Sequence, residues 1–244
     1  MEWLGAVGAT MLLSLAPIFK VPAIGFRYAR REGTVAFSLF SLMFILAFQY
    51  YRMVGDLPIP PDLMTRADQP LILVGLEKIA IAAAALFAVY LAATLLRGQP
   101  LRSAGWNRKL LGGALRMGFG VALVVLFLRG KALTILGGVS TEEITALLLW
   151  LGIAFAEETV FRGYIQLRFQ AWLGDRWGWL ATAGLFTLWY LPGRLGALPL
   201  NVFLWGLLFA LVQALILGWM MKKSNHVAAP FLYRAISGWL LFLL

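Results

Sequence analysis

Long apolar stretches recur along the chain, and they restrict its fold more than any other feature of the sequence. A helix needs about 20 mostly apolar residues to cross a lipid bilayer, and 61% of the 244 residues are hydrophobic. The sequence therefore predicts an all-α fold, a polytopic transmembrane helical bundle of about eight helices. The predicted spans cover residues 3–19, 34–53, 71–96, 110–128, 142–170, 178–191, 199–221 and 227–244.

The residue types that are scarce exclude several kinds of site. The chain has no cysteine, which excludes disulfides, thiol nucleophiles and thiolate metal sites. Its single histidine is His226, so the HExxH arrangement of zinc proteases is excluded as well. The net charge is +10, but no basic and aromatic cluster resembles a nucleic-acid surface. We therefore predict membrane lipids, and no nucleic acid, as the partners of the basic residues.

The distribution of lysine and arginine predicts the topology. The first and third connections between predicted spans hold four basic residues each, whereas the second, counted from Arg52, and the fourth hold two each. The fifth, counted as Arg168 and Arg176, and the seventh hold two each, and the sixth holds one. Because basic loops stay in the cytoplasm, both termini are predicted outside it, in a bacterial inner membrane. We divide the chain into peripheral helices, residues 1–102, and a functional core, residues 103–244.

The segment AFAEETVFRGY places three ionisable side chains inside an apolar run. Glu158 and Arg162 are four residues apart, which brings them together on one helix face as a pair. Glu157 points about 100° away, and we predict that it faces a cavity as a general base while Glu158 is a structural anchor. The alternative is a salt-bridged cluster that only fixes helix packing.

The depth of the acidic doublet predicts its access. Ser140 and Glu143 have the spacing of a capping box, so the helix is predicted to begin there. Glu157 follows Ser140 by 17 residues, or about 25 Å of helix. That distance passes the midplane, so water and substrate are predicted to arrive from the cytosol.

Other ionisable residues are interpreted as structural. Glu77 and Lys78 lie in the third predicted span and Arg116 in the fourth. We favour an ion pair between Glu77 and Arg116 that fixes packing, although intramembrane charges are often functional. His226 follows a polar turn, and we interpret it as a non-catalytic loop residue.

Two motifs resemble those of the CAAX prenyl endopeptidase and bacteriocin-processing (CPBP, or Abi) family of glutamic intramembrane proteases. The first motif of that family is E-E-x-x-x-R, matched here by Glu157, Glu158 and Arg162. The second is F-x-x-x-H on the next helix. The segment FTLWY matches it with Phe186, but Tyr190 stands in the histidine place.

A third motif extends the resemblance to the end of the chain. In the family it reads H-x-x-x-N or H-x-x-x-D and follows a polar turn and a proline. Here the turn is followed by Pro230, with Arg234 in the histidine place and Gly238 in the asparagine place. The segment SAGWNRKL also resembles the linker that precedes this domain, so the likeness covers residues 103–244.

The resemblance implies how such a site works. Glu157 would activate water for attack on a peptide carbonyl, with Glu158 and Arg162 in support. Tyr190 and Arg234 would replace the histidines as donors to the oxyanion. Neither transfers protons readily near neutral pH, because their reference pKa values are about 10 and above 12.

Three functions fit these residues. The first is a CAAX-protease-like intramembrane endopeptidase that cleaves a membrane-associated protein or peptide. The alternative is an inactive protease homologue that acts as a membrane binding or scaffold subunit. Such a homologue could assemble with a partner subunit. The third is a transporter or lipid handler.

We predict no cofactor and no metal, because glutamates alone are an unusual zinc ligand set. A cavity joining Glu157, Tyr190 and Arg234 would favour the enzyme. A direct contact of Arg234 with a glutamate would favour the binding protein.

Overall fold

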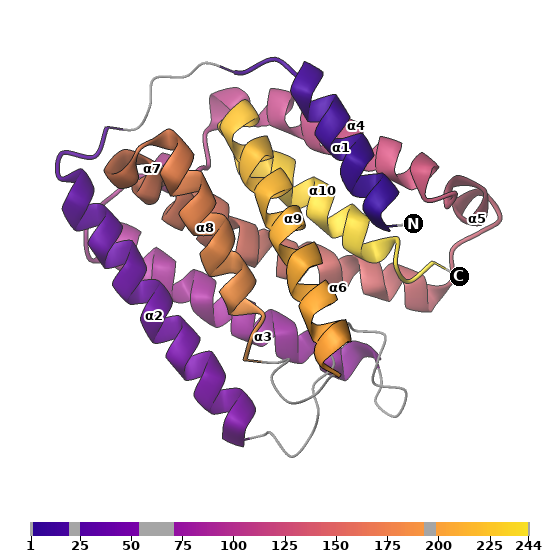
Figure 1. Ribbon diagram of the computed structural model, residues 1–244, viewed down its shortest axis with the longest axis horizontal. Helices are drawn as coiled ribbons and strands as arrows, with labels where there is room; N and C mark the ends of the chain where they lie inside the picture. The colour runs from indigo at the N-terminus through magenta and orange to yellow at the C-terminus, as the bar shows by residue number, and fades with distance from the viewer. Residues whose placement is uncertain (1, 20–24, 54–70, 193–198, 244) are drawn as a thin grey trace.

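The computed structural model describes residues 2–19, 25–53, 71–192 and 199–243, and in these residues all regular structure is helical (Figure 1). Two π-helical segments, η1 and η4, continue α-helices without a break, and η2 and η3 are short 3-10 helices. The elements are α1 (Glu2–Leu15), α2 (Ala29–Met53), α3 (Leu71–Tyr90), η1 (Leu91–Leu95), η2 (Leu101–Ala104), η3 (Arg108–Leu110), α4 (Leu111–Leu128), α5 (Ala132–Leu136), α6 (Thr141–Glu158), η4 (Thr159–Gln166), α7 (Leu167–Leu173), α8 (Asp175–Trp189), α9 (Leu200–Ser224) and α10 (Ala228–Trp239).

Each predicted span coincides with a helix, which confirms the all-α transmembrane bundle. Five helices are long and apolar enough to cross a membrane by length and composition: Ala29–Met53, Gly75–Leu95, Arg108–Leu128, Thr141–Leu173 and Leu200–Ser224. The first, sixth and eighth predicted spans correspond to shorter helices, α1 with 14 residues, α8 with 15 and α10 with 12. The long polar connection of residues 54–70 lies outside the described residues.

The helices of the first half pack directly onto those of the second half. α1 contacts α4 and α9, α2 contacts α7, and α3 contacts α6. At the centre, α10 lies between α4 and α6, and α8 lies between α7 and α9 (Figure 1). The division between residues 102 and 103 stays a prediction.

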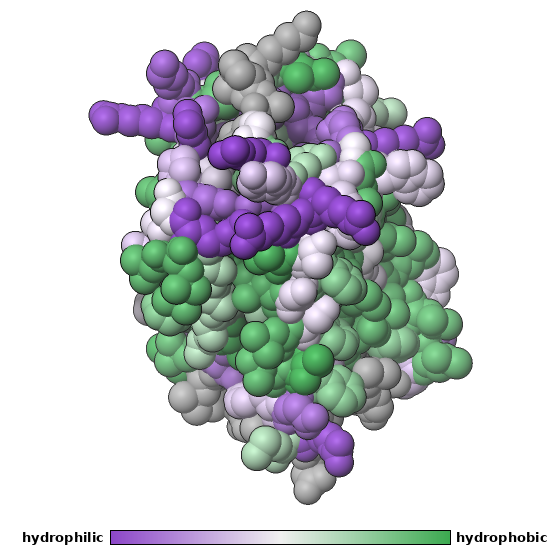
Figure 2. Space-filling view, turned by 90° about the vertical axis from the view of Figure 1, so that its left-hand side faces the viewer, coloured by the Kyte–Doolittle hydropathy of each residue, from purple (hydrophilic) through white to green (hydrophobic). Residues whose placement is uncertain are grey.

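The two ends of the bundle differ in charge. The connections α1–α2, α3–α4, α7–α8 and α9–α10 meet at one end, which we call the basic end (Figure 1). We call the opposite end, where α1 and α9 begin, the N-terminal end. Figure 2 shows a hydrophilic band at the level of α7 and a broad hydrophobic zone below it, as expected of a protein embedded in lipid. Basic residues near the basic end include Arg27, Arg30, Arg97, Arg102, Arg108, Lys109, Lys222 and Lys223.

The helix that carries the acidic doublet begins as predicted. The Ser140 hydroxyl accepts a hydrogen bond from the Glu143 amide at 3.2 Å, and the Glu143 carboxylate accepts one from the Ser140 amide at 2.7 Å. This capping box satisfies two amides at the start of α6. The helix then continues through η4 and α7 to Gly174, whose φ of 84° ends it. A π-helical segment inside a long helix is frequent at functional sites.

Candidate active site

The five predicted site residues come together from three parts of the fold. Glu157 and Glu158 are the last residues of α6, and Arg162 follows in η4. Tyr190 is the C-cap of α8, and Arg234 lies in the middle of α10. Glu158 and Arg162 are 0% exposed, Arg234 is 1% exposed and Glu157 is 9% exposed. The side chains of four of the five residues are therefore removed from solvent.

Arg234 is the centre of this cluster. Its Nη1 donates a hydrogen bond to Glu158 Oε1 at 2.8 Å. Its Nη2 donates to Glu157 Oε2 and contacts the Tyr190 hydroxyl. One guanidinium group thus neutralises both carboxylates in part and joins α6, α8 and α10, as the planar donor fork of arginine allows.

Glu158 has the predicted environment, but Glu157, which was predicted to face a cavity, is 9% exposed and bonded to Arg234 and Trp189. Arg162 Nε lies 3.3 Å from Glu158 Oε2, so the predicted pair one turn apart is confirmed. Arg162 also donates to the Ala214 carbonyl at 3.2 Å, which ties η4 to α9. Glu158 therefore lies between two arginines as an anchor, whereas Glu157 forms an ion pair with Arg234. Two carboxylates and two guanidinium groups balance one another.

Two aromatic residues of α8 complete the cluster. Phe186 is fully buried, and its ring lies 4.0 Å from the Arg162 guanidinium carbon and 4.8 Å from that of Arg234. Such contacts stabilise desolvated cations. Trp189 Nε1 donates to Glu157 Oε1 at 3.1 Å. Sequence reasoning missed Trp189, and its only signal was its position beside Tyr190 in FTLWY.

Gly238 in the asparagine place has a packing function. A Cβ atom at Gly238 would lie 2.6–2.8 Å from ring atoms of Trp150. The indole of Trp150, on α6, therefore occupies the space that a side chain at Gly238 would take. A glycine at this position and a tryptophan facing it on α6 form a matched pair.

We expect Gly238→Ala to destabilise the protein by about 1–3 kcal/mol, because the added Cβ would lie 2.6–2.8 Å from the Trp150 ring, which would have to shift. The measurement is thermal unfolding in detergent. Gly184→Ala is the matched control, because a Cβ there meets no atom within 4 Å. That helical substitution is expected to be neutral or stabilising by up to about 1 kcal/mol. Equal effects of the two substitutions would contradict the packing role.

His226 has a structural role in the turn before α10. The side chain is 1% exposed, and its Nδ1 accepts the Ala228 amide at 2.9 Å. The proton of the neutral ring therefore belongs on Nε2. The ring packs edge-on against Trp106, with centroids 5.3 Å apart. His226 thus caps a helix, and the site cluster lies elsewhere.

The stability of the folded protein is expected to fall as the pH is lowered below about 6.5, which is the pKa of an unperturbed histidine. Burial lowers the pKa of His226, so the unfolded chain binds a proton at a higher pH than the folded protein. The stability of the neutral cap is complete above the unfolded pKa and is lost as the pH falls towards the folded pKa. His226→Asn, which keeps an acceptor, should flatten this part of the profile of unfolding temperature against pH. An unchanged profile would contradict the assignment.

A second buried ion-pair network lies near the basic end. Arg168 is 0% exposed, and its Nε lies 3.2 Å from Glu32 Oε2. Arg97 binds the same carboxylate through two nitrogens, at 2.9 Å and 2.5 Å. Sequence analysis counted Arg168 as a charge of the fifth connection, but it lies inside α7 and joins that helix to α2.

The predicted pair of Glu77 and Arg116 is replaced by other contacts. Glu77 Oε1 accepts a hydrogen bond from the Tyr50 hydroxyl at 3.3 Å. Arg116 is exposed, and its Nε donates to the Gly112 carbonyl of its own helix at 3.3 Å. Glu77 therefore connects α3 to α2 instead of α4.

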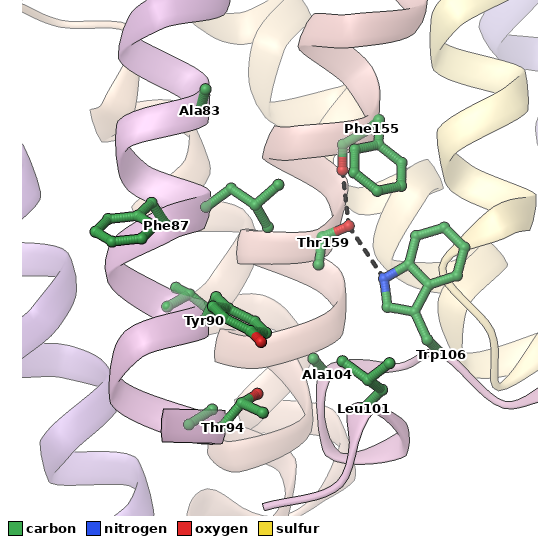
Figure 3. Close-up of a pocket in the computed structure, with 12 residues that line it drawn as sticks. Ala83, Phe87, Tyr90, Thr94, Leu101, Ala104, Trp106, Phe155 and Thr159 are labelled. Atoms are coloured by element: carbon green, nitrogen blue, oxygen red, sulfur yellow. Dashed lines mark hydrogen bonds between the residues drawn. The ribbon is translucent and has the colours of Figure 1, made fainter. Parts of the chain in front are cut away.

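Two cavities lie near the cluster. One has a volume of about 420 Å³, and Tyr190 lines it together with Trp150, Gln213 and Ser237. The other, about 440 Å³, is an apolar groove between α3 and the α6–η4 helix. Figure 3 shows its Trp106 wall, where Nε1 donates to Thr159 Oγ1 at 3.2 Å. The direct contact of Arg234 with both glutamates occupies the centre of the site, and the larger free spaces lie beside it.

The family comparison concerns the segment that carries the cluster. Residues 140–240 match the family model of type II CAAX prenyl endopeptidase Rce1-like proteins. No match was found among curated proteins or among solved structures. The matched segment begins at the capping box of α6 and includes all five site residues. This segment is therefore similar to the CAAX-protease-like (CPBP/Abi) family that the motifs of the sequence resemble.

Proposed function

We propose that the protein is a glutamate-dependent intramembrane endopeptidase that cleaves a membrane-associated protein or peptide. One observation carries this proposal. Glu157, Tyr190 and Arg234 come from three helices, stand where the family motifs place the base and the two histidines, and lie in one bonded cluster. A general base beside two oxyanion donors is the minimum set for peptide hydrolysis by water.

The reaction follows from the bonds in the cluster. Arg234 moves from Glu157 to the substrate carbonyl, which Tyr190 also contacts as a donor. Water attacks the carbonyl carbon and gives a proton to Glu157, while negative charge on the carbonyl oxygen meets Arg234. The carbon–nitrogen bond then breaks, and Glu157 returns the proton to the leaving amine. Glu158 and Arg162 remain paired and hold the end of α6 in place.

A second function is favoured by the ion pair itself. In the free protein Arg234 bonds to both carboxylates, and Trp189 engages the other oxygen of Glu157. Trp150 also fills the space at the asparagine place. If this closed arrangement persists when a ligand binds, the protein is an inactive homologue that holds a membrane-associated polypeptide.

The test is turnover by the purified protein in liposomes. Single-span peptides with tails of varied sequence are incubated with the wild-type protein, and mass spectrometry detects new termini. Cleavage supports the endopeptidase. Crosslinking of the same peptides without any cleavage supports the binding protein and sinks the proposal.

We also propose the orientation in the membrane. The basic residues near the basic end favour its location in the cytoplasm, with both termini outside, in a bacterial inner membrane. Protease protection of tags fused to the two termini would test this, because degradation of both tags only from the cytoplasmic side would contradict it.

A further inference from the structure

The apolar groove of about 440 Å³ runs along α3 towards the basic end (Figure 3). One wall is formed by α3 and η1, from Ala83 to Thr94, and the other includes Phe155 and Trp106. Thr94 follows Ala83 by 11 residues, which corresponds to about 16 Å of helix. Ala83 lies near the middle of the membrane-spanning stretch Gly75–Leu95. The groove therefore extends over about one leaflet, because the hydrocarbon core of a bilayer is about 30 Å thick.

The polarity of the lining changes along the groove. The half near Ala83 is lined by apolar side chains such as Phe87 and Phe155. The hydroxyl groups of Tyr90 and Thr94 lie nearer the basic end (Figure 3). The groove therefore suits a ligand that is apolar over most of its length and polar where it meets the basic end.

The polar groups of the second wall are already bonded to one another. Trp106 Nε1 donates to Thr159 Oγ1 at 3.2 Å, and Thr159 Oγ1 donates to the Phe155 carbonyl at 2.7 Å. A polypeptide backbone in the groove would bring amides and carbonyls that the apolar half cannot pair, which is costly at membrane depth. An acyl chain brings no such groups, so the lining favours a hydrocarbon chain.

The groove is open to lipid along its side and has a cation at its basic end. Phe87 is 62% exposed and Leu101 is 58% exposed, so a chain can enter sideways from the bilayer. Leu101 and Ala104 line the groove at the basic end (Figure 3). Arg102 lies between them in η2, is exposed, and forms no ion pair with any residue that the structure describes. A cation at the level of the headgroups attracts an anionic phosphate.

We propose that this groove binds one anionic phospholipid of the leaflet at the basic end. One acyl chain lies along α3 from Thr94 to Ala83, and the phosphate lies beside Arg102. The volume falls within the range of about 300–1,000 Å³ of ligand pockets. Phe155 and Thr159 precede and follow the acidic doublet on one continuous helix. The bound lipid therefore connects α3 to the helix that carries the candidate active site.

The headgroup is tested by native mass spectrometry of the full chain with phosphatidylglycerol and phosphatidylcholine of identical acyl chains. We expect one phosphatidylglycerol to bind about fivefold more tightly than phosphatidylcholine, the factor for one arginine near an anionic headgroup. Arg102→Gln should remove this preference. Arg176→Gln should keep it, because Arg176 is exposed on α8, which contributes no residue to the groove. Equal affinity of the wild type for both lipids, or an unchanged preference in Arg102→Gln, would overturn the proposal.

Two substitutions on α3 test the position of the acyl chain. Ala83 and Ala84 are adjacent and both exposed, but Ala83 lines the groove and Ala84 does not. Ala83→Phe should weaken phosphatidylglycerol binding about tenfold or more, because the ring takes the place of several methylene groups of the chain. Ala84→Phe should leave the affinity unchanged. Equal affinities of the two variants would show that the chain does not lie in the groove.

A photoreactive phosphatidylglycerol, with a diazirine in one acyl chain, locates the lipid on the wild-type protein without any variant. Its adducts should lie on α3 between Ala83 and Thr94 and at Phe155. Leu46 and Leu204 are the matched comparison, because they are 60% and 55% exposed but lie outside the groove. Equal labelling of these two leucines and the groove would mean that the lipid is bulk solvent. None of these measurements requires cleavage, so their outcome is separate from that of the endopeptidase.

Discussion

Replacement of Glu157 by glutamine is expected to abolish peptide cleavage while the protein remains folded. Glutamine has nearly the same shape and keeps an acceptor for Trp189 Nε1, but it cannot accept the proton of water. Loss of a general base costs about 10²- to 10⁴-fold in rate. Arg234 retains its 2.8 Å bond to Glu158, so the cluster keeps its anchor. The measurement is the rate of appearance of new peptide termini, with thermal unfolding as the check on folding.

The matched control for this substitution is Glu142→Gln. Glu142 is an exposed acidic residue in the first turn of the same helix, far from the cluster. Its replacement is expected to leave the cleavage rate unchanged. A Glu157→Gln protein that retains wild-type turnover would remove Glu157 from the mechanism.

Arg234→Leu is expected to have the largest effect on stability. It removes the cation that contacts both buried carboxylates and leaves Glu158 with Arg162 alone. Breaking a buried ion pair by removal of one partner costs about 3–5 kcal/mol, because a charge is left buried without compensation. Unfolding by heat or denaturant in detergent measures the loss. Arg116→Leu serves as the comparison, because that arginine is exposed on α4, and its replacement should change stability by less than about 0.5 kcal/mol.

A double substitution separates charge from packing. In Arg234→Leu/Glu158→Leu the orphaned carboxylate is removed as well, so part of the lost stability should return. We expect a coupling energy of about 0.5–3 kcal/mol between the two positions. Strictly additive effects would mean that Arg234 stabilises the fold through its hydrocarbon stem and not through the ion pair.

The bundle and the Glu158–Arg162 pair were predictable because both depend on local patterns. Apolar length identifies a membrane helix, and a spacing of four residues brings side chains together on one helix. The Ser140 capping box was visible for the same reason. Resemblance of short motifs supplied the rest, since it placed Tyr190 and Arg234 in one site before any contact was known.

Contacts between distant segments could not be predicted from local patterns. Trp150 and Gly238 are a matched pair across α6 and α10, but each residue alone is ordinary in a membrane helix. Arg168 was counted with the basic connections because a terminal arginine and a buried arginine look alike in sequence. Only the fold shows that it shares Glu32 with Arg97. The Glu77–Arg116 pairing was wrong because α3 packs mainly on α6, and Glu77 bonds to Tyr50 of α2.

The balance of two acidic and two basic groups in the cluster has an electrical consequence. A membrane voltage acts on net charge with about 2.3 kcal/mol per elementary charge for each 100 mV, so the closed cluster as a unit experiences almost no force. Once Arg234 leaves Glu157, a positive and a negative charge are separated, and the field acts on the component of that separation along the membrane normal. The membrane potential can then favour or oppose opening of the site, even though no ion is transported.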